Sequence, residues 1–171
     1  MTISMYQASV PVFKRILDNL DHIIDKAAAD AETRKIDPAV FLQARLAPDM
    51  LNFIRQVLIA ADFAKGTAAR LAGVEVPKYE DNEASFADLK ARIKKTQDYI
   101  ATFKPAQIDG SEERAVTCQA GPRKLDFKGL DYLLGFALPN FYFHYTTAYA
   151  ILRHNGVNLG KMDYVAGRTA G

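Results

Sequence analysis

Apolar residues recur along the first part of the chain in alternating steps of four and three. This spacing places them on one face of an α-helix, so it predicts an amphipathic helix from about Ser4 to Ala29. Pro11 lies inside the pattern and either kinks the helix or marks its true start. The residues of the predicted buried stripe are Tyr6, Val10, Phe13, Leu17, Leu20 and Ile24.

A second stripe with the same spacing predicts a helix that begins at Pro48-Asp49 and ends at Gly73. Proline suits the first turn of a helix, where its missing N–H is not needed, and a carboxylate there interacts well with the helix dipole. The stripe contains several alanines, which predict close approach of a neighbouring helix. Its members are Met50, Ile54, Val57, Ala61, Ala64, Ala68 and Leu71.

Ser85 and Asp88 have the spacing of a capping box, which predicts a third helix that starts there and stops at Lys104-Pro105. Its apolar stripe is Phe86, Leu89, Ile93, Ile100 and Phe103. Beyond it the pattern changes to an alternation, which predicts a short hairpin or an extended loop. The alternating residues are Val116, Cys118, Leu125 and Phe127, on either side of Ala120-Gly-Pro122.

A brief helical turn or crossover is expected over residues 129–136, followed by a fourth long helix. Pro139 suits its first turn, and Asn155-Gly156 is a strong C-terminal stop. Its aromatic residues cover every side, which is typical of a central, buried helix, although a ligand-stacking surface is an alternative. These residues are Phe141, Tyr142, Phe143, Tyr145 and Tyr149.

Four long helices with short or moderately long links predict an all-α protein, an antiparallel four-helix bundle with a hairpin or extended excursion before the last helix. No repeat, low-complexity tract or linker divides the chain, so one domain is expected over residues 1–171.

Composition narrows the classes of function. The formal charge of +2 is too small for a nucleic-acid-binding surface, and no apolar stretch reaches the roughly 18 residues of a membrane span. The N-terminus lacks the features of a signal peptide. Cys118 is the single cysteine, which predicts a buried structural thiol in a reducing compartment. We therefore expect a cytoplasmic protein with neither nucleic-acid nor membrane partners.

The histidines of the fourth helix are the first candidates for chemistry. His144 and His154 are ten residues apart, which is about 15 Å of rise and about 80° of rotation, so they cannot bind one metal ion together. His144 either lines a pocket with Asn140 or is a buried histidine bonded to another helix. His154 lies in the last turn, where a cation stabilises the helix end. His22 is interpreted as a surface residue.

No phosphate-binding loop, dinucleotide fingerprint or nucleophile motif occurs in the chain. Several segments nevertheless resemble a bacterial branch of uncharacterised domains in the DinB/YfiT-like superfamily. They are residues 45–50, 55–57, 60–65, 69–73, 138–144, 148–157 and 159–164.

The resemblance implies a DinB-type four-helix bundle, often dimeric. Many members bind a divalent metal through one histidine on the second helix and an H-x-x-x-H pair on the fourth, and characterised relatives include thiol-dependent S-transferases and a maleylpyruvate isomerase. His154 matches the last of these histidines, whereas Ala150 stands where its partner would be and Gln56 where the second-helix histidine would be. The resemblance therefore implies the fold without the usual metal site, and no cofactor is expected.

Three hypotheses follow. The first is a metal-free bundle that binds a small molecule in the former metal cleft, with His144 as the candidate general base. The cleft would be lined by Asp49, Gln56, Asn140, Tyr149 and His154. The second is an S-transferase-like or isomerase-like enzyme that holds a divalent metal through a changed ligand set, Asp49 or Asp62 with a histidine. The third is a non-catalytic module whose apolar faces build a homodimer.

Overall fold

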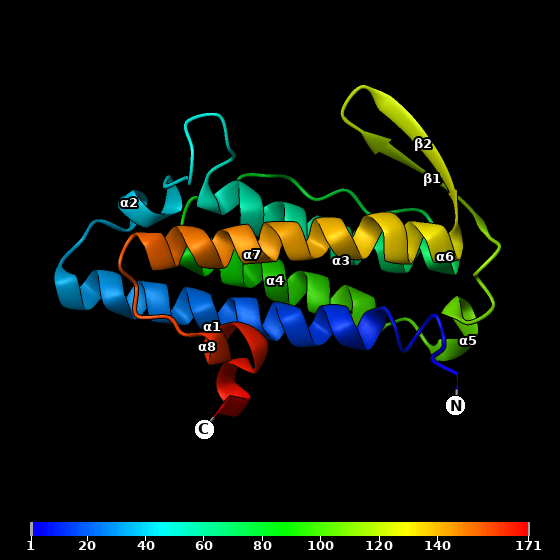
Figure 1. Cartoon of the computed structure of the whole chain (residues 1–171), viewed down its shortest axis with the longest axis horizontal. Coiled ribbons are helices and arrows are strands. Elements are labelled where there is room, and N and C mark those ends of the chain that lie inside the picture. The colour runs from blue at the N-terminus through cyan, green and yellow to red at the C-terminus, as the bar shows by residue number, and fades with distance from the viewer. Residues whose placement is uncertain (1, 171) are drawn as a thin grey trace.

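Four long helices lie side by side along the long axis of the computed structural model, which describes residues 2–170 (Figure 1). They are α1 (Val10–Arg34), α3 (Phe53–Ala72), α4 (Phe86–Ala101) and α7 (Leu138–His154). Shorter elements join them: α2 (Pro38–Leu42), α5 (Pro105–Ile108), β1 (Ala115–Ala120), β2 (Arg123–Lys128), α6 (Gly129–Asp131), the π-helix η1 (Tyr132–Ala137), α8 (Lys161–Val165) and the 3₁₀-helix η2 (Gly167–Ala170). The chain is thus mostly helical, with one small sheet. Residues 1 and 171 of the predicted domain lie outside the described residues.

Of the two alternatives for Pro11, the structure confirms that it marks the true start of the first helix, whereas the predicted start of the second helix is wrong. Helix α1 begins at Val10, because Pro11 occupies its first turn and cannot continue a helix from the preceding residues. Helix α3 begins at Phe53, where the side chain of Asn52 accepts a hydrogen bond from the Arg55 N–H at 3.1 Å. Pro48-Asp49 therefore lies in the loop before α3.

Other helix ends agree with the prediction. The capping box of Ser85 and Asp88 is present at the start of α4. Helix α3 ends at Gly73, whose φ of 72° closes the last turn in the left-handed conformation. Helix α4 stops at Ala101, before the predicted Lys104-Pro105.

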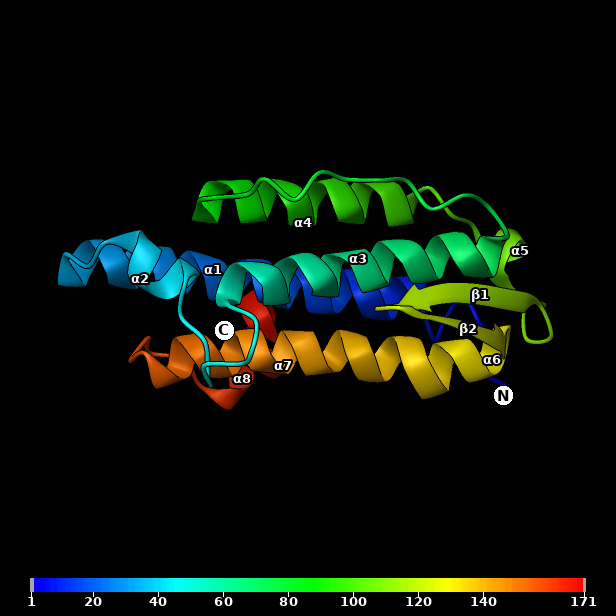
Figure 2. The same ribbon diagram turned by 90° about the horizontal axis from the view of Figure 1, so that it is seen from above.

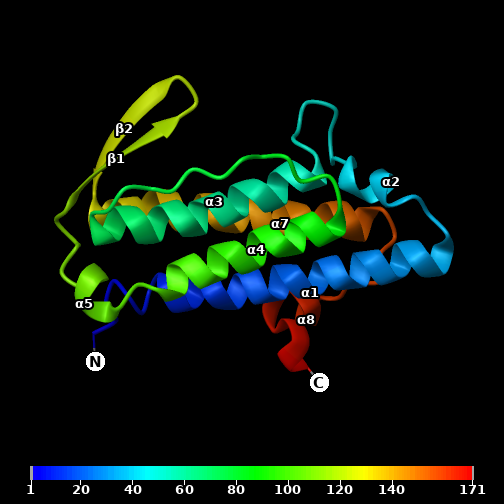
Figure 3. The same cartoon turned by 180° about the vertical axis from the view of Figure 1, so that it is seen from behind.

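The direction of the helices differs from the prediction at one connection. The segment of residues 73–85 runs back along the molecule, so α3 and α4 point the same way instead of antiparallel (Figures 2 and 3). Thirteen extended residues span about 43 Å, which exceeds the roughly 24 Å length of a sixteen-residue helix. The connection is therefore long enough to cross over. Helix α7 runs antiparallel to α3, and α1 antiparallel to α4.

The predicted hairpin is present. Strands β1 and β2 pair antiparallel, with Cys118 opposite Leu125 and Val116 opposite Phe127. Cys118 is buried, as expected for a structural thiol. Seen from above, the hairpin lies between α3 and α7 in projection (Figure 2).

Residues 129–154 form one continuous helical segment rather than a turn followed by a separate helix. A proline ring clashes with the carbonyl four residues earlier in a regular α-helix, and the wider π turn of η1 stands just before Pro139. The side chain of Asn140 donates a hydrogen bond to the Phe136 carbonyl at 2.7 Å. Asn140 therefore satisfies a backbone group of the π turn.

The aromatic run of α7 is not buried on every side, so that prediction is wrong. Phe141 and Tyr145 lie in the core, whereas Phe143 is 55% exposed. Helix α7 packs mainly on α3 and has contacts with α1, which leaves its outer face without a covering helix.

The C-terminal segment is held against α1 by ion pairs. Asp163 lies 3.0 Å from His22 Nε2 and 2.9 Å from Lys26 Nζ. Arg168 pairs with Asp21 and Asp25. His22 is therefore a half-buried partner of the C-terminal segment, not a simple surface residue.

Candidate functional site

His144 and Gln56 meet across the interface of α7 and α3. The distance between His144 Nδ1 and Gln56 Oε1 is 2.7 Å. Gln56 is buried, and its Nε2 donates to the Leu51 carbonyl at 3.0 Å, which fixes the orientation of the amide. The amide oxygen therefore accepts from His144, so the neutral imidazole carries its proton on Nδ1. Its Nε2 keeps a lone pair.

Aromatic rings enclose the imidazole. The Phe63 ring stacks on it with centroids 6.0 Å apart, and the Phe143 ring meets it edge-on at 5.2 Å. Burial lowers the pKa of His144 from 6.5 to about 4. The side chain is consequently neutral at physiological pH and a weak base.

The other site residues suggested by the sequence are spread over the molecule. Tyr149 packs edge-on against Tyr164 of the C-terminal segment, with centroids 5.6 Å apart. His154 is exposed in the last turn of α7, and Asp49 is exposed in the loop before α3. Within the described part of the chain, Gln56 and His144 are the two residues of the suggested set that are hydrogen-bonded to each other. Asn140 lies one helical turn before His144.

The donor set does not fit the superfamily's metal site. His154 lies ten residues beyond the residue that contacts Gln56, about 15 Å further along the helix. Ala150 offers no ligand atom, and both ends of the Gln56 amide are already hydrogen-bonded. Within residues 2–170, no group of three or more His, Cys, Asp or Glu side chains is arranged to hold a metal ion. Asp62, suggested for a changed ligand set, pairs with Lys65 Nζ at 2.6 Å.

A small pocket lies near this pair, and Phe63 is one of its lining residues. It is open to solvent, has a volume of about 140 Å³ and is lined by residues of α3, η1 and the hairpin. We call it the Arg70 pocket. Its lining residues are Ile59, Asp62, Phe63, Arg70, Cys118, Gln119, Tyr132 and Phe136.

Arg70 and Tyr132 form the polar end of the Arg70 pocket. Arg70 Nη1 donates to the Tyr132 hydroxyl at 3.1 Å, and Thr67 Oγ1 lies 3.4 Å from the same hydroxyl. Among the described residues, no carboxylate lies within 4.0 Å of the Arg70 guanidinium. Burial raises the pKa of the neighbouring Cys118 thiol, with a smaller opposing effect from the Arg70 charge, so this thiol stays protonated.

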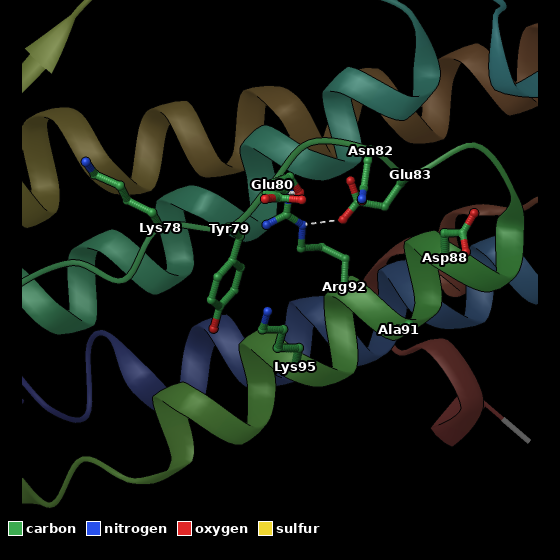
Figure 4. Close-up of a pocket in the computed structure, with 9 residues that line it drawn as sticks. All are labelled: Lys78, Tyr79, Glu80, Asn82, Glu83, Asp88, Ala91, Arg92 and Lys95. Carbon is green, nitrogen blue, oxygen red and sulfur yellow. Dashed lines mark hydrogen bonds and ion pairs between the residues drawn. The ribbon is translucent and has the colours of Figure 1, made fainter.

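A second cavity, of about 520 Å³, lies between α4 and the crossing segment of residues 73–85 (Figure 4). We call it the Arg92 pocket. The Arg92 guanidinium is buried and lies 2.6 Å from Asp81 Oδ1 and 2.7 Å from Glu83 Oε1. Tyr79 is surrounded by cations, with Lys65 Nζ and Lys95 Nζ each 4.1 Å from its ring centroid. These contacts fasten the crossing segment to α4.

Comparison with known proteins agrees with the fold and with the resemblance seen in the sequence. The chain is 42% identical to a protein whose crystal structure is described as that of a DinB family member from Shewanella denitrificans. The match covers 94% of this chain and 91% of that chain, with a TM-score of 0.84. No curated protein matches the chain.

The chain is therefore a DinB family protein. Within that class, residues 5–165 match the family described as Domain of unknown function (DUF1993), and the chain belongs to it. Among residues 2–170, no helix combines the length and hydropathy needed to cross a membrane.

Proposed function

We propose that this protein binds a small molecule in the cleft between α3 and the η1–α7 helix, without the superfamily's three-histidine metal site. The observation that carries the proposal is the Arg70 pocket. Ligand sites are concave, mostly apolar and provided with a few convergent polar groups. The pocket has aromatic walls from Phe63, Tyr132 and Phe136 and a polar end at Arg70.

In this proposal the Gln56–His144 pair holds Phe63, a wall residue of the Arg70 pocket, in position. The imidazole stacks on one wall residue, Phe63, and is oriented by the buried Gln56 amide. His144 is not among the residues that line the pocket, so in this proposal it positions Phe63 and does not touch the ligand. None of the six residues that the sequence suggested for the cleft lines the Arg70 pocket itself. Gln56 and His144 support its Phe63 wall, whereas Asp49, Tyr149 and His154 have no part in this proposal.

The proposal extends to the assembly. We propose that the four long helices form one DinB/YfiT-type bundle domain that works as a cytoplasmic homodimer. Exposed apolar side chains on the outer face of η1 and α7 support a dimer: Leu134 is 53% exposed and Phe143 is 55% exposed. Light scattering at several concentrations tests this part, and a strict monomer would contradict it.

The binding proposal is tested by filling the pocket. In a ligand-observed NMR screen with small fragments, the wild-type protein should bind a subset, and Ile59→Phe should lose that subset because the larger side chain occupies the cavity. Ala91→Phe is the matched control, since it places the same ring in the Arg92 pocket. Binding that survives Ile59→Phe, or a screen without a single hit, would overturn the proposal.

The metal-free part has its own measurement. Elemental analysis of the natively purified protein should find only traces of transition metals. A stoichiometric metal would favour the alternative, an enzyme with a changed ligand set.

A further inference from the structure

The residues that line the Arg70 pocket also indicate the chemical class of its ligand. The inference of that class rests on the function proposed above. A guanidinium has five N–H donors in a planar fork, which matches a carboxylate. Among the described residues, Arg70 donates one hydrogen bond, to a neutral hydroxyl, and has no carboxylate within 4.0 Å. The half-buried cation therefore has unused donors beside a cavity.

The position of the Arg70 guanidinium depends on a glycine within α3. A Cβ atom on Gly66 would lie 2.4 Å from Arg70 Nη1, which is closer than atoms can approach. Glycine in the middle of a helix is less favourable than alanine. Here it leaves room for the arginine one turn later to fold back along α3 towards the Tyr132 hydroxyl.

The charges around the cavity favour an anion at the Arg70 end. Asp62 lines the same pocket, but Lys65 Nζ lies 2.6 Å from its carboxylate and offsets its charge. The Cys118 thiol is protonated, because burial raises its pKa. Arg70 is thus the one cation in the lining, and no lining residue neutralises it directly.

The remaining walls set the shape of the ligand. Phe63 and Phe136 lie 5.9 Å apart between ring centroids, and Tyr132 and Phe136 lie 6.1 Å apart. The volume of about 140 Å³ is close to that of apolar cavities of roughly 150 Å³ that accommodate benzene. Ring centroids at these distances mean that Phe63, Tyr132 and Phe136 pack directly on one another. The rings form a continuous aromatic wall, and a flat apolar body of about one ring can lie against it.

We infer that the Arg70 pocket binds a small monocarboxylate with a flat apolar body, with the carboxylate on the Arg70 guanidinium and the body against Phe63 and Phe136. The hairpin covers the bound molecule through Cys118 and Gln119. The inference assigns the ligand class and implies no reaction.

Benzoate is the probe, and benzamide is its neutral counterpart of the same shape. Isothermal titration or NMR titration of the full chain should show benzoate binding at least about tenfold tighter than benzamide. Arg70→Met should remove that preference by weakening benzoate while leaving benzamide unchanged. Inorganic phosphate, which lacks the apolar body, should bind more weakly than benzoate.

Gly66→Ala gives a second test that leaves the arginine in place. The added methyl group displaces the guanidinium, so benzoate should again weaken about tenfold, while the melting temperature stays within a few degrees. Equal affinity for benzoate and benzamide, unchanged benzoate binding in both variants, equal binding of phosphate, or no benzoate binding up to about 10 mM would each overturn the inference.

The two levels of the proposal fail separately. If Ile59→Phe abolishes fragment binding while Arg70→Met does not alter it, the pocket binds ligands but not through a carboxylate. If Ile59→Phe has no effect, the proposed function itself is wrong.

Discussion

Two arginines in this protein lie beside cavities and near a tyrosine ring, yet their surroundings differ. Arg92 is 3% exposed and is paired with both Asp81 and Glu83. Arg70 is half-buried, and its hydrogen-bond partner among residues 2–170 is the neutral Tyr132 hydroxyl. The charge of Arg92 is therefore already neutralised within the chain, whereas that of Arg70 remains available. This difference makes Arg92 a structural residue and Arg70 a candidate for binding.

The comparison also shows that cavity volume alone is a poor guide to function. The Arg92 pocket, at about 520 Å³, is several times larger than the Arg70 pocket. Its polar groups, however, hold the crossing segment against α4. Buried atoms such as Glu83 Oε2 and Arg92 Nη1 have no hydrogen-bond partner within the described part of the chain. Buried polar atoms of this kind are often satisfied by ordered water. The smaller pocket has the apolar walls and the uncompensated charge that a ligand requires.

Replacing each arginine by methionine should give the largest difference in the free energy of unfolding between the two regions. Arg92→Met should lower the free energy of unfolding by about 3–5 kcal/mol, because it leaves the Glu83 carboxylate buried without its partner. Arg70→Met should lower it by only about 1 kcal/mol, since one hydrogen bond to a neutral group is lost. Urea unfolding of the two variants measures both values.

Adding Glu83→Gln to Arg92→Met is the control, and it should recover part of the loss because the unpaired charge is removed as well. An Arg70→Met variant as unstable as Arg92→Met would contradict the comparison and make Arg70 a structural residue.

The contributions of His144 and Asp81 to stability should be lost in different pH ranges. Burial lowers the pKa of His144 to about 4, so the unfolded chain takes up this proton first and stability should fall as the pH drops from about 6.5 to about 4. For Asp81, desolvation raises the pKa, but the hydrogen bond from Arg55 and the charges of Arg55 and Arg92 outweigh it and lower the pKa overall. The stability that Asp81 supplies is thus present above its unfolded pKa of about 3.9 and is lost only below it.

Unfolding free energies measured at several pH values test this separation. His144→Phe should flatten the decline between about pH 6.5 and pH 4, although it also lowers stability at neutral pH by leaving Gln56 Oε1 without its donor. Asp81→Asn should leave the slope in that range unchanged. A decline that persists in His144→Phe would show that another group titrates there.

Much of the helical content could be predicted from the sequence, because apolar periodicity reports directly which face of a helix is buried. The sequence left two alternatives for the start of α1, and Pro11 marks the true one. The start of α3 could not be predicted, since the apolar stripe begins before Asn52, which caps the first turn. The parallel course of α3 and α4 depends on the path of the connecting segment, which carries no periodic signal. Contact with α4 through Arg92 holds that path in place.

The candidate site was only partly visible in the sequence for a related reason. The sequence suggests both Gln56 and His144 as site residues. It does not show that they meet each other far from His154, because this contact depends on how α3 and α7 align. Arg70 and Tyr132 are 62 residues apart and meet only in the folded chain. The one local signal was Gly66, an isolated glycine in a helical pattern four residues before an arginine.

The smallest expected effect on the free energy of unfolding comes from replacing one buried threonine by valine in the Arg70 region and one in the Arg92 region. Thr67 and Thr96 are both fully buried on long helices. Thr67 Oγ1 lies 3.4 Å from the Tyr132 hydroxyl, whereas Thr96 Oγ1 has no hydrogen-bond partner among the residues that the structure describes. Thr67→Val should therefore lower the free energy of unfolding by about 1 kcal/mol, and Thr96→Val should raise it by up to about 1 kcal/mol. Because the change in side chain is identical, differences in helix propensity and volume largely cancel between the two variants.

Urea midpoints shifting in opposite directions would support a polar network that is satisfied beside Arg70 and incomplete beside Arg92. A loss of equal size in both would mean that the Thr96 hydroxyl is satisfied by ordered water, and the contrast between the two pockets would then rest on the charges of the arginines alone.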